Sequence, residues 1–199
     1  MANDFDTGRP SFDGVLLAGG RSLRMGTDKA CLTLPDGNVL WRRQRAVLEE
    51  AGADTVFLSV RPEQIWADAD AHRVEDSLPD AGPLAGIVAA FERSRATHLQ
   101  VLAVDLPRLP ARWLRELSRH CRIDAGACGR HADGTFEPLA AVYPVSWLPE
   151  WRAALLAGDR SLQRLLARAC ERGDLLAQPI EAAQAHWFYN VNRPADLQP

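Results

Sequence analysis

The sequence predicts an α/β fold, a Rossmann-like three-layer sandwich with a mostly parallel sheet and helices on both faces. Short aliphatic segments alternate along the chain with segments whose apolar residues recur at helical spacing. The aliphatic segments are unbroken runs, which indicates strands buried on both faces. Ligands of such sheets bind outside the carboxyl ends of the strands. Functional residues are therefore expected after Leu17, Val60, Val74 and Val104.

Each element is predicted from its apolar pattern and from the residues that end it. Gly52 stands directly after one apolar-periodic segment, where glycine often follows a helix, and Pro83 opens another. Arg61-Pro62 ends a β-branched run. The predicted strands are residues 12–18, 55–60, 73–74, 99–104 and 139–143. The predicted helices are residues 39–51, 83–95, 111–121, 147–156 and 161–172, and residues 190–197 form a closing turn.

Length and composition favour one globular domain. The chain has 199 residues, of which 47% are apolar and 25% charged, so fibrous and wholly disordered classes are excluded. We expect residues 12–199 to form the domain and the polar residues 1–11 to form a flexible segment. The first residues lack an apolar signal core and the apolar runs are too short to span a bilayer, so a cytoplasmic location without a membrane partner is expected.

Charge and cysteine content exclude further classes. The net charge of −3 argues against a nucleic-acid partner held by bulk positive charge. Four separate cysteines without a C-x-x-C pair are typical of reduced thiols. A zinc site at residues 120–131 matches no common ligand spacing. The G-x-S-x-G pattern is absent and no cysteine has a catalytic histidine beside it, which disfavours covalent hydrolysis.

The loop after the first predicted strand combines glycine with positive charge. The adjacent Gly19-Gly20 pair lets the backbone approach a bulky ligand and direct amide hydrogens at it. Arg21, Arg24 and Lys29 outweigh Asp28, and Lys29 is the only lysine in the chain. The loop matches neither the P-loop nor the dinucleotide fingerprint. It suits a triphosphate, and the alternative is a solvated glycine turn.

Other candidates follow later strands. Asp105 ends an aliphatic run, where a carboxylate can hold Mg²⁺ together with substrate phosphates or can simply cap a turn. Glu75-Asp76 precedes the small residues 82–86, which leave room for a flat ring or form an ordinary helix start. Asn190 and Asn192 place two amides on one side of an extended segment, or belong to a turn.

Together these motifs resemble the molybdenum cofactor guanylyltransferases of the nucleotidyltransferase family. Four groups match in order: residues 17–29, Glu75-Asp76 with residues 82–86, Asp105-x-Pro107, and Asn190-Val191-Asn192-x-Pro194. Residues 137–143 and 158–162 are also similar, so the resemblance covers residues 15–197. It implies a nucleotidyltransferase domain at residues 12–199. That domain would transfer GMP from GTP to the terminal phosphate of molybdopterin, releasing pyrophosphate and forming molybdopterin guanine dinucleotide.

The resemblance also implies roles for individual residues. The nucleotide-binding residues would be Leu17, Ala18, Gly19, Gly20, Arg21, Lys29, Asp76 and Asp105. Lys29, Arg24 and Asp105 would be catalytic, with Lys29 most important for transition-state charge and Asp105 the Mg²⁺ ligand. Asn190 and Asn192 would lie on the pterin side or support the metal. GTP and molybdopterin would be the substrates, and a molybdoenzyme or its chaperone would receive the product.

Two departures and three rival interpretations accompany the resemblance. Leu58 stands where the family often has a nucleotide-contacting asparagine, and the turn at residues 35–38 is slightly longer than usual, which we interpret as a surface insertion. A cytidylyltransferase for the same cofactor, a sugar-phosphate nucleotidyltransferase and a non-catalytic nucleotide-binding protein remain alternatives. Cytidylyltransferases for this cofactor more often have an alanine at the position of Gly19 and differ around Pro83-Leu84, so the resemblance favours guanine over cytosine. The short chain disfavours the sugar-phosphate class, and the presence of both Lys29 and Asp105 disfavours a protein without catalysis.

Overall fold

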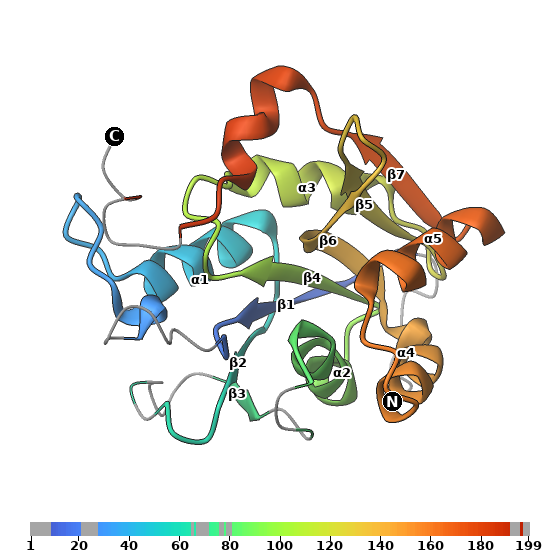
Figure 1. Cartoon of the computed structure of the whole chain (residues 1–199), viewed down its shortest axis with the longest axis horizontal. Helices are drawn as coiled ribbons and strands as arrows, with labels where there is room; N and C mark the ends of the chain where they lie inside the picture. The colour runs from blue at the N-terminus through green and yellow to red at the C-terminus, as the bar shows by residue number, and fades with distance from the viewer. Residues whose placement is uncertain are drawn as a thin grey trace, which may run out of the picture.

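The computed structural model describes residues 9–20, 28–64, 66, 72–75, 78, 81–191 and 196 (Figure 1). Within them, seven strands form one sheet in the order β3-β2-β1-β4-β6-β5-β7. The strands are β1 (Phe12–Leu17), β2 (Val56–Val60), β3 (His72–Glu75), β4 (His98–Ala103), β5 (Gly126–Arg130), β6 (Phe136–Pro144) and β7 (Leu175–Pro179). The α-helices are α1 (Leu40–Ala51), α2 (Pro83–Arg93), α3 (Ala111–His120), α4 (Leu148–Leu156) and α5 (Leu162–Arg172). Short 3-10 helices are η1 (Lys29–Cys31), η2 (Val145–Trp147) and η3 (Ala182–Phe188).

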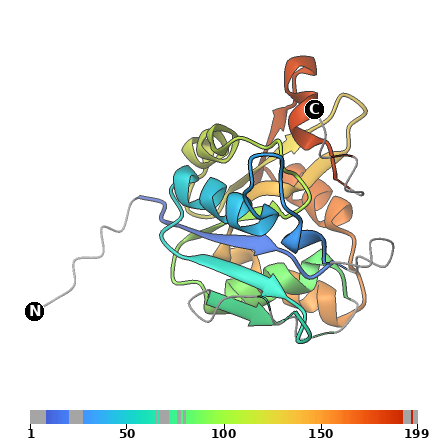
Figure 2. The ribbon, with the colours of Figure 1, turned by 90° about the vertical axis from the view of Figure 1, so that its left-hand side faces the viewer.

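The helices cover both faces of the sheet. Figures 1 and 2 show α1 and α3 on one side of it and α2 and α4 on the other. Two apolar clusters fill the layers: one joins the sheet to α1 and α3, and the other joins it to α2, α4 and α5. Buried residues run without interruption along α2 from Leu84 to Phe91, because the helix lies between the sheet and α4. The predicted three-layer α/β sandwich is confirmed.

Strand directions decide which residues meet at one edge of the sheet. Strands β1 to β4 are mutually parallel, as are β5 and β7, whereas β6 is antiparallel to both β4 and β5. The sheet is therefore mostly parallel, as predicted. Because β6 runs in reverse, its first residues lie at the edge where β1, β4 and β5 end. The register pairs Leu102 with Ala140 and Gly129 with Glu137, which places Glu137 at that edge.

Several elements differ from the prediction. The structure adds β5, β7 and η3, and it extends β6 to Phe136–Pro144. The sequence of β5 is Gly-Ala-Cys-Gly-Arg, which has little β-propensity. Close packing requires its glycines, since a Cβ atom at Gly126 would lie 2.5 Å from the Val142 carbonyl oxygen. Strand β7 is an edge strand whose partly exposed residues lack a clear apolar pattern.

The ends of the chain are only partly described. Residues 1–8 of the expected flexible segment lie outside the described residues, as does most of the predicted closing turn at 190–197. Ser11 is tied to Thr97, whose Oγ1 accepts from the Ser11 amide at 2.8 Å. No helix in the described part of the chain combines the length and the apolar character needed to cross a bilayer.

Gly86 allows α2 to approach the sheet closely. A Cβ atom at this position would overlap the Ser59 hydroxyl and lie 2.9 Å from Leu17 Cδ2. We expect Gly86→Ala to lower the free energy of unfolding by about 1–3 kcal/mol, because α2 must move away from β1 and β2. Urea denaturation measures the loss. In combination with Ser59→Ala the loss should be smaller than the sum of the two single changes, and strict additivity would contradict this explanation.

Candidate functional site

Lys29 and Asp105 meet at the carboxyl edge of the sheet. Lys29 begins η1, whose first turn is capped by Asp28: its Oδ1 accepts from the Ala30 amide at 3.1 Å. Asp105 follows β4, and its Oδ2 lies 3.4 Å from Lys29 Nζ although 76 positions separate the two residues. Their side chains are 16% and 28% exposed, so both charges remain accessible from the edge. The sequence prediction that these two groups share one site is consistent with this contact.

The loop after β1 is anchored by the segment that follows β2. Arg61 Nη1 donates to the carbonyl oxygens of Gly19 and Gly20 at 2.6 and 2.5 Å. In a trans peptide the N–H points opposite to the preceding carbonyl, so the Gly20 amide is directed away from Arg61. Gln64 Nε2 donates to the Ala18 carbonyl at 2.9 Å. These bonds fix the glycine turn before any ligand binds.

Asp28 connects the two ends of that loop. Its Oδ2 accepts from Gln64 Nε2 and from the Trp66 indole, both at 2.6 Å. The sequence did not indicate Arg61, Gln64 or Trp66 as site residues. The available signal was their position just after the second strand, where the strand-end rule already directed attention. Asp28 therefore holds the loop in place, and among the described residues of the loop Lys29 is the charged group beside Asp105.

The C-terminal segment reaches the same place. The Val191 amide donates to the Asp105 carbonyl at 2.9 Å, so Asn190 is held next to the loop that carries Asp105. Arg21, Arg24, Asp76 and Asn192 lie outside the described residues. The described part of the predicted site thus consists of residues 17–20, Lys29, Asp105 and Asn190.

A second pair of titratable residues stands on the other side of Asp105. His131, just after β5, lies with Nε2 3.3 Å from Glu137 Oε2 on β6. Burial raises the pKa of the Glu137 carboxyl, the bond to His131 opposes that shift, and the Asp105 charge adds to it. Sequence reasoning noted Glu137 only within a family-like stretch and considered His131 only for a zinc site. Both belong to the edge that carries Asp105.

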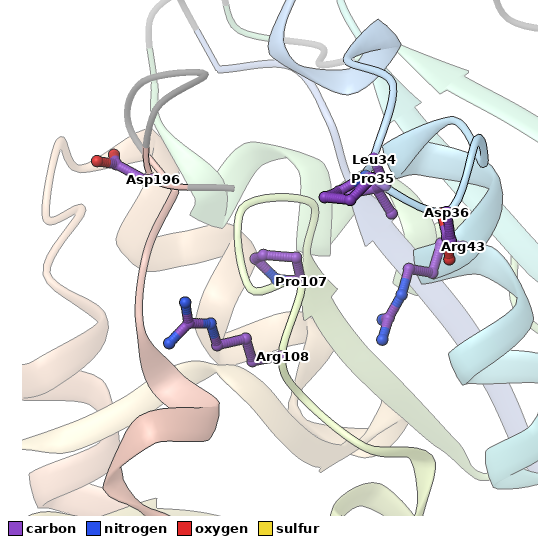
Figure 3. A pocket seen from close by; sticks show the side chains of 7 residues that line it. All are labelled: Leu34, Pro35, Asp36, Arg43, Pro107, Arg108 and Asp196. Carbon is purple, nitrogen blue, oxygen red and sulfur yellow. The ribbon is translucent and has the colours of Figure 1, made fainter. Parts of the chain in front are cut away.

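A cavity of about 260 Å³ lies behind the Asp105 loop. Figure 3 shows Pro107 and Arg108 on one side of it, residues 34–36 on another and Asp196 on a third. Its volume is slightly below the usual range of about 300–1,000 Å³ for ligand pockets. The turn at residues 35–38 thus supplies part of the cavity wall.

Comparison with known proteins shows the family of the chain. The model of the MobA-like NTP transferase domain matches residues 14–174. The chain belongs to this family. A probable molybdenum cofactor guanylyltransferase from Opitutus terrae is 42% identical over 186 residues, which are 92% of this chain and 91% of that protein. A molybdenum cofactor guanylyltransferase from Rhizobium leguminosarum is 31% identical and covers 98% of this chain and 93% of its own length.

Solved structures with a similar fold include a protein of molybdopterin-guanine dinucleotide biosynthesis. A molybdopterin-guanine dinucleotide biosynthesis protein A from Archaeoglobus fulgidus superposes with a TM-score of 0.71 at 25% identity, covering 93% of this chain and 94% of its own. A nucleotidyl transferase from Methanothermobacter reaches a TM-score of 0.72 at 19% identity, covering 94% of each chain, and shows the fold alone. The MobA-like NTP transferase family therefore accounts for both sequence and architecture.

The departure at Leu58 has a structural explanation within this MobA-like chain. Leu58 is 3% exposed and packs in the cluster between the sheet and α1, so its side chain does not reach the strand edge. Directly before α2, Gly82 adopts a φ of 74°, which favours glycine and turns the chain into the helix at Pro83.

Asp105 is the described carboxylate that best fits a divalent cation. Within the described ranges, no three histidine, cysteine, aspartate or glutamate residues converge as a metal-binding group. One carboxylate plus substrate phosphates is nevertheless a common way to hold Mg²⁺, and Asp105 is accessible beside the cationic Lys29. Two of the four thiols do not compete: Cys121 and Cys128 are buried, and burial raises the pKa of Cys121 to about 12.

Proposed function

We propose that the protein transfers GMP from GTP to the terminal phosphate of molybdopterin, with release of pyrophosphate. The observation that carries the proposal is the Lys29–Asp105 contact at the strand edge, in a chain 42% identical to a probable molybdenum cofactor guanylyltransferase. The edge offers a fixed glycine turn, a compact cation and an accessible carboxylate. A nucleoside triphosphate and its accompanying cation need those three features.

The chain's own residues would lower the barrier by holding charge and position. The acceptor phosphate is already an anion, so the reaction needs no strong base. It forms a bond from an acceptor oxygen to the α-phosphorus and breaks the bond to pyrophosphate. The Gly20 amide and Lys29 would bind phosphate oxygens, and Asp105 would hold Mg²⁺. When bound, Mg²⁺ neutralises phosphate charge and orients the triphosphate.

The contact between Lys29 and Asp105 balances two charges in the chain without substrate. On nucleotide binding, Lys29 would exchange the carboxylate for phosphate oxygens, which costs little because the pair is only partly buried. Arg21 and Arg24 would add charge to the same phosphates, Asp76 would contact the nucleotide, and Asn190 with Asn192 would face the acceptor. Each of these assignments rests on the family's motif.

Product analysis tests the proposal directly. The purified protein is incubated with molybdopterin, Mg²⁺ and each of the four nucleoside triphosphates, and the products are weighed by mass spectrometry. We expect a guanine dinucleotide product with GTP and little product with the other three. Efficient use of CTP would favour the cytidylyl alternative, and the absence of any nucleotide adduct would reject nucleotidyl transfer to this acceptor.

A further inference from the structure

The order of the strands determines which groups are neighbours along the carboxyl edge of the sheet. The loop carrying Lys29 follows β1, Asp105 follows β4, and Glu137 and His131 stand on β6 and after β5. The sheet order β1-β4-β6-β5 therefore places Asp105 between the nucleotide loop and the His131–Glu137 pair. The groups expected to hold the triphosphate lie on one side of Asp105 and this pair lies on the other.

Direct substitution at phosphorus imposes the same two-sided arrangement. The attacking and leaving oxygens lie roughly in line on opposite sides of the α-phosphorus. If the pyrophosphate is bound by the loop between β1 and α1, the acceptor must approach across Asp105, from the side of β6 and β5. On that side the Glu137 carboxyl is close enough to feel the charge of Asp105, and its partner His131 lies 3.3 Å from it.

Two contacts hold the His131 ring beside Glu137. Its Nε2 is held by Glu137, and its ring packs edge-on against Phe188 at a centroid distance of 5.9 Å. Phe188 is buried, and three residues later Val191 bonds to the Asp105 carbonyl. The His131 side chain remains 32% exposed, against 19% for Glu137. Glu137 and Phe188 thus hold the imidazole ring, and part of the ring remains exposed to solvent.

We propose that His131, positioned by Glu137, binds the phosphate of the acceptor and sets it in line with the α-phosphorus. The inference rests on the proposed function and names the acceptor side of the same site. An imidazole N–H donated to a phosphate oxygen provides a charge-assisted hydrogen bond that a neutral wall would not. Glu137 holds the ring through Nε2, which leaves Nδ1 to face the acceptor.

A purely structural ion pair makes a different prediction. If the pair served only to join β5 to β6, its loss would reduce stability without a selective effect on one substrate. The tip of the same hairpin offers a matched control, because exposed Asp133 accepts from the Thr135 amide and hydroxyl at 2.9 and 2.7 Å. Asp133→Ala removes these two bonds and keeps both side chains of the His131–Glu137 pair.

Steady-state kinetics with GTP and molybdopterin test the proposal. His131→Ala should raise the KM for molybdopterin about tenfold, with the KM for GTP changed less than about twofold. His131→Asn, whose amide carries a donor near the position of Nδ1, should recover part of the loss. Asp133→Ala should match the wild type in both KM values. Thermal unfolding of each variant checks that the protein is folded.

The double variant separates positioning from independent contact. Because Glu137 acts through His131, adding Glu137→Ala to His131→Ala should raise the KM for molybdopterin no further. Additive losses, an equal rise in the KM for GTP, or a wild-type KM in folded His131→Ala and His131→Asn would each overturn the assignment. A wild-type enzyme that forms no guanylylated product would overturn the proposed function as well, so the two failures are distinguishable.

Discussion

Lys29→Ala is expected to lower kcat for guanylyl transfer by about a hundredfold or more. Loss of one preorganised charge contact to the transition state typically has an effect of this size. Lys29 is the only lysine in the chain and its ammonium lies 3.4 Å from Asp105, at the edge where the triphosphate is proposed to bind. The effect should fall mainly on kcat, because negative charge develops on the departing pyrophosphate in the transition state. Steady-state rates at saturating GTP and molybdopterin measure it.

Two further variants show whether the loss of activity is specific to the ammonium of Lys29. Lys29→Arg keeps the positive charge but replaces a compact ammonium by a planar guanidinium, so partial activity is expected. Arg45→Ala removes a cation from an exposed ion pair with Glu49 on α1 and should leave kcat unchanged. Thermal unfolding checks that both Lys29 variants are folded. A wild-type kcat in folded Lys29→Ala would remove Lys29 from the mechanism.

The strand-end rule explains why Lys29 and Asp105 could be predicted together from sequence. Each follows a strand whose aliphatic run is readily identified, and parallel neighbours bring their carboxyl ends to one edge. The contact between Lys29 and Asp105 therefore needed only the direction and order of β1 and β4. The same reasoning directed attention to the residues after β2, although it did not specify Arg61, Gln64 and Trp66. Side-chain bonds across an irregular loop leave no periodic signal in sequence.

Glu137 and His131 illustrate the limit of that rule. Strand β6 is antiparallel to β4, so its amino end, rather than its carboxyl end, lies at the functional edge. The reversal depends on pairing with β5, whose two glycines give little strand signal. Packing makes those glycines necessary, because a Cβ atom at Gly129 would lie 2.9 Å from Trp113 and Ile180. The positions of Glu137 and His131 at this edge thus depend on long-range packing, which the local sequence pattern does not reveal.

Asp105→Asn is expected to abolish most Mg²⁺-dependent transfer. The substitution keeps the size of the side chain but removes the negative charge that one protein carboxylate contributes to a phosphate-bound cation. The loss should exceed that of Lys29→Ala, because the phosphate contacts proposed for Arg21 and Arg24 would remain in the lysine variant, whereas Asp105 is the one carboxylate proposed to hold the cation. Excess chelator should reduce the wild-type rate to a similar level.

Binding measurements separate this role from a general loss of structure. Calorimetric titration with GTP, with and without Mg²⁺, should show that the cation strengthens binding to the wild type and has little effect on Asp105→Asn. Glu92→Gln removes one carboxylate from an exposed ion pair with Arg152 and should leave both activity and the Mg²⁺ effect unchanged. The neutral amide introduced by Asp105→Asn would also end the attraction to Lys29, so GTP binding without Mg²⁺ should be equal to or tighter than in the wild type. A full Mg²⁺ effect in Asp105→Asn would place the cation on another residue.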